Sequence, residues 1–155
     1  MADLFIDSSN ALASAEKEQR KISQKEFEIK LADINNRYSA TSDSSAYYYY
    51  NQQKKMLLET EVSSYKNQRD NYINVALLYA LNLGELEVMR NETYSRASIA
   101  LASICTFLTI QNIHISLSYS VIQKIFSLSS ILTLHPSDFF SLRQSLNNLK
   151  TFLGI

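Results

Sequence analysis

The sequence is poor in the residues that break regular structure. Its 155 residues include only two glycines and one proline, and tryptophan is absent. Sheets joined by tight turns, phosphate-binding loops and nucleotide-binding folds need many more glycines and prolines. This scarcity favours a chain made of long helices and argues against a glycine-rich nucleotide site.

An excess of charge of one sign is also missing. Fifteen basic residues balance fifteen acidic ones, so we expect no general attraction to nucleic acid or anionic lipid. Cys105 is the single cysteine and cannot form an internal disulfide, which favours a reducing compartment. The first residues carry Asp3 and Asp7 and do not resemble a secretory signal. We therefore expect a location in the cytoplasm or inside an assembled particle, with membrane association as an alternative.

The charges that are present lie mostly in the first part of the chain. Residues 97–123 carry no formal charge. We therefore predict a charged amphipathic helical hairpin at 1–83 and an apolar helical region at 84–155, packed together as one domain. The predicted fold class is all-α, with a long antiparallel hairpin that resembles a coiled coil.

The first predicted helix covers residues 10–38. Phe27, Leu31, Ile34 and Tyr38 recur at the spacing of one helical face, so we expect them to pack against the next helix. Residues 39–45 then form a turn.

The second predicted helix covers residues 44–83 and carries a heptad pattern in which tyrosine replaces leucine. Gly84 is expected to end or kink this helix. Arg69 is the one polar residue in the predicted seam. The seam residues proposed as an interface are Leu58, Val62, Tyr65, Tyr72 and Tyr79, continued by Ala76, Leu83 and Leu86.

Four consecutive tyrosines stand near the start of the second helix: Tyr47, Tyr48, Tyr49 and Tyr50. Successive helical residues are about 100° apart, so the four rings cover most of the circumference. One interpretation packs two rings in the hairpin and leaves two exposed. The other is contact on several sides from neighbouring subunits, since tyrosine is enriched at such interfaces.

The uncharged region allows several interpretations. We predict a third helix at 85–110, and a C-terminal helix with Ser137 as N-cap and Gly154 after its end. The segment 105–121 fits either a β-hairpin with its turn at Gln111 and Asn112 or a helical pattern that continues for about twenty residues from Ile113, and the length of the helical pattern favours the helix. Six apolar residues are candidates for a membrane segment or a buried interface: Ile99, Leu101, Ile104, Phe107, Leu108 and Ile110.

A bilayer-spanning helix needs about twenty mostly apolar residues. Gln111, Asn112 and His114 weaken such a span, so a buried interface is the preferred explanation.

Catalytic and metal-binding patterns are lacking. The sequence has no phosphate-binding loop, no G-x-S-x-G, no H-E-x-x-H and no C-x-x-C. Cys105, Asn112 and His114 are the only candidates for a nucleophile, orienter and base. Carboxylates two residues apart, such as Glu85 and Glu87, point to different sides of a helix and are expected to be solvated. We predict no enzyme activity, no metal and no cofactor.

The predicted function is that of a structural subunit. We expect it to assemble with copies of itself or with other subunits of a larger particle, such as a virion, a tail or a secretion machine. The first alternative is a membrane-active protein that inserts residues 97–134. The second is a helical adaptor or chaperone.

Overall fold

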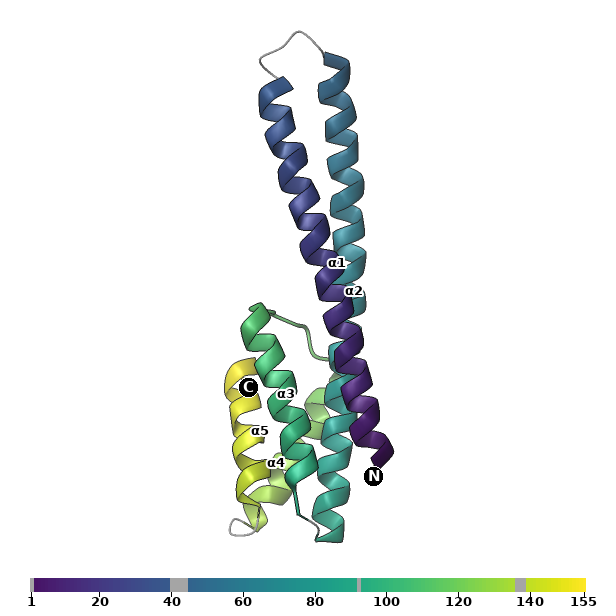
Figure 1. Ribbon diagram of the computed structural model, residues 1–155. Helices are drawn as coiled ribbons and strands as arrows, with labels where there is room; N and C mark the ends of the chain where they lie inside the picture. The colour runs from purple at the N-terminus through teal and green to yellow at the C-terminus, as the bar shows by residue number, and fades with distance from the viewer. Residues whose placement is uncertain (1, 40–44, 92, 136–138) are drawn as a thin grey trace. The chain divides into compact units, whose positions relative to one another are not determined.

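The computed structural model describes residues 2–39, 45–91, 93–135 and 139–155. Within these ranges the regular structure consists of five α-helices, and there is no strand (Figure 1). The helices are α1 (Ala2–Ser39), α2 (Ser45–Arg90), α3 (Ser95–Gln111), α4 (Tyr119–Leu134) and α5 (Phe140–Leu153). The predicted all-α fold is confirmed.

The chain divides into two compact units. The hairpin unit is Ser14–Arg69, and the core unit comprises Met1–Ala13 and Asp70–Ile155. In the hairpin unit α1 and α2 run antiparallel and side by side, as Figure 1 shows. α1 already begins at Ala2, eight residues before the predicted start, because no strong breaker precedes Asn10.

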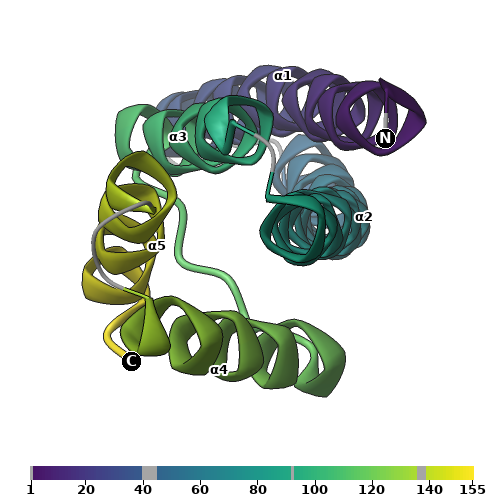
Figure 2. The same ribbon diagram turned by 90° about the horizontal axis from the view of Figure 1, so that it is seen from below.

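The core unit is built around the end of α2, which is apolar on nearly every side. Ile73, Leu77 and Leu81 are fully buried there, as the sequence pattern indicates. α5 lies between α3 and α4 (Figure 2) and contacts both. α4 contributes Val121, Ile125, Leu128 and Leu132 to the core, and α5 contributes Leu142, Leu146 and Leu149. Each such leucine or isoleucine stabilises the unit by about 1.5–3 kcal/mol.

Gly84 does not end a helix. α2 continues through it to Arg90, and Gly84 is buried. A β-carbon added there would lie 3.0 Å from Leu128 Cδ2 and 3.7 Å from Ala97 Cβ. The predicted helix stop is therefore wrong, because this glycine provides space for α4 and α3 rather than a left-handed conformation.

The start of α3 also differs from the prediction. α3 begins at Ser95 rather than Glu85, and its backbone N–H at Ala97 donates to Glu87 Oε2 at 3.4 Å. Helix N-termini have unpaired N–H groups and a positive dipole end, so they attract a carboxylate. Glu87 is buried in this role, which corrects the expectation that it is solvated. Glu85, by contrast, pairs with Lys124 of α4.

Residues 113–118 form neither of the two predicted structures. α3 ends in left-handed geometry at Asn112, with φ of 50°, and residues 113–118 are irregular. The Asn74 side chain holds them from α2: its Nδ2 donates to the Ser116 carbonyl at 3.1 Å, and its Oδ1 accepts from the Ser118 N–H at 2.8 Å. Because this asparagine satisfies the backbone without a helix, the predicted helix is correct only from Tyr119 onward.

The C-terminal helix agrees with the sequence pattern. Phe139 is buried, as are Leu142, Leu146 and Leu149 of α5, and Phe152 is half-buried. Gly154 is left-handed with φ of 69°, and the following Ile155 N–H donates to the Lys150 carbonyl at 3.1 Å. The predicted N-cap Ser137 and most of the predicted turn at 39–45 lie outside the described residues.

Candidate interaction surface

α1 and α2 meet in the hairpin unit along a heptad seam. Buried and half-buried residues recur at spacings of three and four on both helices, as in a coiled coil. The α1 side consists of Ala15, Glu18, Ile22, Lys25, Ile29, Ala32 and Asn36. The α2 side consists of Asn51, Lys55, Leu58, Val62, Tyr65 and Arg69.

Much of this seam is polar, and ion pairs between the helices hold it together. Lys25 Nζ lies 3.2 Å from Glu61 Oε2, and Lys55 Nζ lies 2.8 Å from Asp33 Oδ1. The hydrogen bonds that Lys25 donates to Glu61 and Glu28 raise its pKa. The hydrogen bond that Lys55 donates to Asp33 raises the pKa of Lys55 in the same way.

Arg69 belongs to the seam rather than interrupting it. It is buried, and its guanidinium donates to Gln19 Oε1 at 2.8 Å. A further ion pair outside the seam joins Lys66 Nζ to Glu26 Oε1 at 2.9 Å. The heptad pattern predicts an apolar residue at this position. Arginine fits there because its long side chain covers apolar surface while its charged end contacts a polar partner.

Two buried amide side chains, near the end of α1 and the start of α2, weaken the seam. Asn36 is 7% exposed and Asn51 is 4% exposed. Both amide atoms of Asn36 and Nδ2 of Asn51 make no hydrogen bond. A buried polar group without a partner costs about 1–3 kcal/mol. The seam between α1 and α2 therefore contributes little stability for its length.

The outside of α1 is apolar. Phe27, Leu31, Ile34 and Tyr38, which we name the α1 stripe, are 44–75% exposed. This is a correction, because the sequence pattern places them against α2. The seam uses the opposite side of α1, where alanine and isoleucine allow close approach and charged side chains pair across the interface.

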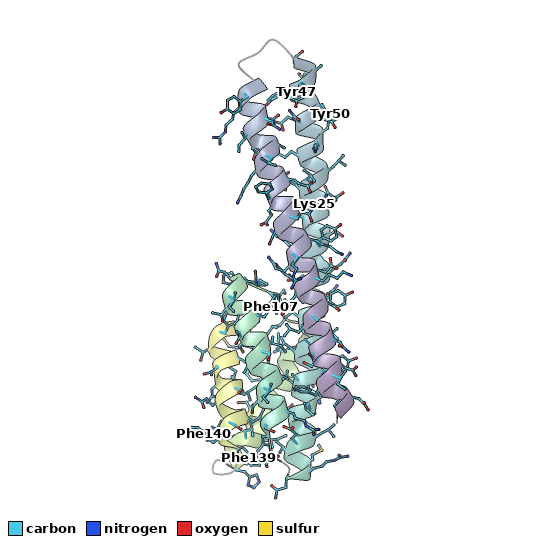
Figure 3. The ribbon with its side chains drawn as sticks, in the orientation of Figure 1. Lys25, Tyr47, Tyr50, Phe107, Phe139 and Phe140 are labelled. Carbon is cyan, nitrogen blue, oxygen red and sulfur yellow. The ribbon has the colours of Figure 1, made fainter. Side chains whose placement is uncertain are left out.

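The outside of α2 is also apolar. The four tyrosines are 39–67% exposed, and Met56 and Leu57 are 66% and 68% exposed. We name these six residues the α2 patch: Tyr47, Tyr48, Tyr49, Tyr50, Met56 and Leu57. Figure 3 labels Tyr47 and Tyr50 in the first two turns of α2.

Two neighbouring tyrosines of the α2 patch contact each other. The rings of Tyr48 and Tyr49 meet edge to face with centroids 6.0 Å apart, and Gln52 Nε2 donates to the Tyr48 hydroxyl at 3.2 Å. All four residues are exposed, including the two that the first interpretation packs in the hairpin. The hairpin unit by itself does not enclose this run.

The remaining predicted interface residues lie in the core unit. Tyr72 is 40% exposed and Tyr79 is half-buried, while Ile73, Ala76 and Ala80 carry the packing beside them. Two residues of the predicted seam, Ala76 and Leu83, are fully buried. At the tyrosine positions the burial lies one residue further along, at Ile73 and Ala80, which leaves both tyrosines partly exposed. Leu101, Ile104, Phe107 and Leu108 are buried in the core unit, whereas Ile99 and Ile110 are exposed.

The described residues offer no group of three or more His, Cys, Asp and Glu side chains that could hold a metal ion.

Burial raises the pKa of the Cys105 thiol to about 11, so the thiolate is scarce at neutral pH and the side chain is a poor nucleophile. Cys105 lines an open hollow between α3 and α5 with Thr109 and Phe152. His114 is exposed on the irregular segment after α3.

Across the ranges that the structure describes, every helix is too short or too polar for a bilayer crossing. The segment 97–134, which the membrane-active alternative inserts as a pair of helices around Gln111 and Asn112, contains most of α3 and all of α4 with the irregular residues 113–118 between them. Comparisons with protein-family models, with curated proteins and with solved structures find no match to this chain.

Proposed function

We propose that this protein is a non-enzymatic structural subunit that assembles with copies of itself or with other subunits. The observation that carries the proposal is the number of large apolar side chains that the hairpin unit exposes. Its seam contains charged and amide side chains, while the α1 stripe and the α2 patch expose ten large apolar side chains. Exposed apolar surface of this extent is typical of protein interaction sites.

The chemistry of the exposed residues supports contact with protein. Tyrosine, phenylalanine and methionine are enriched at interfaces, and lysine and glutamate are depleted there. A tyrosine ring contributes large contact area and loses little side-chain entropy when it becomes ordered. The α1 stripe lies on the side of α1 that faces away from the seam, and the four tyrosines of the α2 patch cover most of the circumference of α2, which supports contact on more than one side.

The test is size-exclusion chromatography with light scattering on the purified chain without detergent. We expect a discrete oligomer. The triple substitution Tyr49→Ser, Met56→Ser and Leu57→Ser should shift it toward smaller species, because it removes apolar area from the α2 patch. The matched control is Tyr119→Ser with Phe140→Ser, which replaces exposed rings of the core unit and should leave the oligomer unchanged.

Each alternative predicts a different result in the same experiment. A clean monomer would contradict self-assembly and favour an adaptor that binds one partner helix. Protein that is recovered only with detergent would favour the membrane-active alternative. An oligomer that survives the α2 patch substitutions would move the interface to another surface.

A further inference from the structure

The α1 stripe is a second heptad pattern on the back of a helix whose front already forms a seam. Leu31 and Tyr38 are seven residues apart, as are Phe27 and Ile34, and the two pairs interleave at spacings of four and three. Such a pattern packs into an identical pattern on another helix, knobs into holes. The side chains are 44–75% exposed and lie on a regular helix, so the surface is formed in advance.

We propose that the α1 stripe pairs with the α1 stripe of a second copy of this chain, parallel and in register. This inference rests on the proposed function and specifies one of its interfaces. In the pair, each stripe residue lies opposite the same residue of the second copy, as in a two-stranded parallel coiled coil.

The charges beside the stripe favour the parallel orientation. One flank carries the exposed cations Lys30 and Arg37, and the other carries Glu28 and Asn35. In a parallel pair a residue on one flank faces the residue five positions later on the opposite flank of the other helix. Lys30 then faces Asn35, and Ser23 faces Glu28, so no like charges meet.

An antiparallel pair that buries the same four residues brings identical flanks together. Lys30 of each copy then lies against Arg37 of the other, which places two like-charge contacts beside a short apolar contact. Like charges at these positions are the usual means by which coiled coils exclude an orientation. The flanking charges thus favour the parallel over the antiparallel orientation of two identical stripes.

The size of the stripe sets the strength of this contact. Four large side chains that are roughly half exposed provide about 400 Å² per copy, against about 800 Å² per partner in a standard stable interface. We therefore expect association at micromolar or higher concentration from this stripe alone. The α2 patch stays uncovered in the pair and is available to further subunits.

Disulfide trapping tests the orientation. In a Cys105→Ser background, Phe27→Cys and Tyr38→Cys are prepared as two separate full-length variants, each of which keeps three stripe residues. We expect each variant alone to form a disulfide-linked dimer on mild oxidation, because each position faces itself. The control Asn67→Cys, at an exposed position of α2, should stay monomeric.

A second measurement tests the energetic contribution of the stripe. Ile34→Glu should raise the dissociation constant of the dimer at least tenfold in sedimentation experiments. Ile6→Glu is the matched control, since Ile6 is also an exposed isoleucine of α1 but lies outside the stripe. Circular dichroism should show equal helicity for both variants.

The outcomes separate this inference from the proposed function. Cross-linking only in a mixture of the two cysteine variants would establish an antiparallel pair and overturn the inference. An oligomer that forms no stripe disulfide and tolerates Ile34→Glu would also overturn it, while leaving the proposed function intact. A native chain that stays monomeric up to about 1 mM, where binding free energies are only about 4 kcal/mol, would overturn this inference and the self-assembly part of the proposed function, and would leave only assembly with other subunits.

Discussion

At the scale of single residues, Gly84 shows how one absent side chain sets the distance between helices. It lies inside α2, where glycine costs about 1 kcal/mol of helix stability relative to alanine. The close approach of Leu128 from α4 and Ala97 from α3 offsets that cost through packing. A sequence pattern alone cannot distinguish this use of glycine from a helix end.

Gly84→Val is expected to destabilise the protein by about 1–3 kcal/mol, because its side chain would overpack the contact with Leu128. Gly84→Ala should change stability by less, since the gain in helix propensity opposes a β-carbon 3.0 Å from Leu128 Cδ2. Both changes in the free energy of unfolding can be measured by chemical denaturation followed by circular dichroism.

A double-mutant cycle is the control for this prediction. Leu128→Ala removes the atoms that the introduced valine side chain would contact, so the combined loss should be smaller than the sum of the two single losses. Strict additivity would show that Leu128 is not what limits the space at Gly84.

At the scale of elements, the hairpin unit contains partly exposed ion pairs that only protonated lysines can make and that contribute modestly to its stability. The pKa of Lys25 is raised by its hydrogen bonds to Glu61 and Glu28, and the pKa of Lys55 by its hydrogen bond to Asp33. A raised folded-state pKa gives a stabilisation that is complete below the unfolded value of 10.5 and is lost as pH rises through the folded value.

The hairpin unit should therefore lose stability above pH 10.5. The matched variant carries Lys25→Arg and Lys55→Arg, and its guanidinium groups stay charged in that range. Thermal unfolding at mildly alkaline and at high alkaline pH should show a smaller loss for this variant than for the native chain. Equal losses would mean that tyrosine ionisation or another group controls the alkaline transition.

The same element shows why some structure follows from the sequence and some does not. α5 is predictable because its single apolar face and its terminal Gly154 are local signals that do not compete with others. α1 carries two heptad patterns, and the more apolar one, from Phe27 to Tyr38, is the more conspicuous. The seam instead uses Ala15, Ile22 and Ala32 with paired charges between them, and those pairs depend on residues of α2 that α1 alone does not reveal.

At the scale of the whole molecule, apolar burial is divided unequally between the two units. Among the residues that the structure describes, Ile22 is the only leucine or isoleucine of the hairpin unit that is less than 2% exposed. The other leucines and isoleucines that are buried to this degree lie in the core unit, in α2 after Arg69, α3, α4 and α5. Local stability follows buried apolar contact, so the two units should open with different free energies.

Hydrogen exchange measured by mass spectrometry should show this difference. We expect amides of residues 14–69 to exchange faster than those of α3, α4 and the end of α2. Exchange should be measured at a concentration at which light scattering shows a monomer, since association through the α1 stripe would protect amides of the hairpin unit. Equal protection in both units would contradict the unequal division of the core.

The tyrosine run is the feature of the sequence from which we predict association. Which other residues expose apolar surface depends on the seam, because burial of one side of α1 determines which side is left. All four tyrosines from Tyr47 to Tyr50 are exposed, but whether they bind a subunit stays a prediction.

The distribution of aromatic rings has a spectroscopic consequence. Without tryptophan, the intrinsic fluorescence of this protein comes from its ten tyrosines, and six of them belong to the hairpin unit. Tyr38 and the four consecutive rings of α2 are exposed to water. The emission of the unlabelled chain is therefore weighted toward the surfaces where we propose contact, and dilution of the protein while its emission is recorded reports on that contact without a dye.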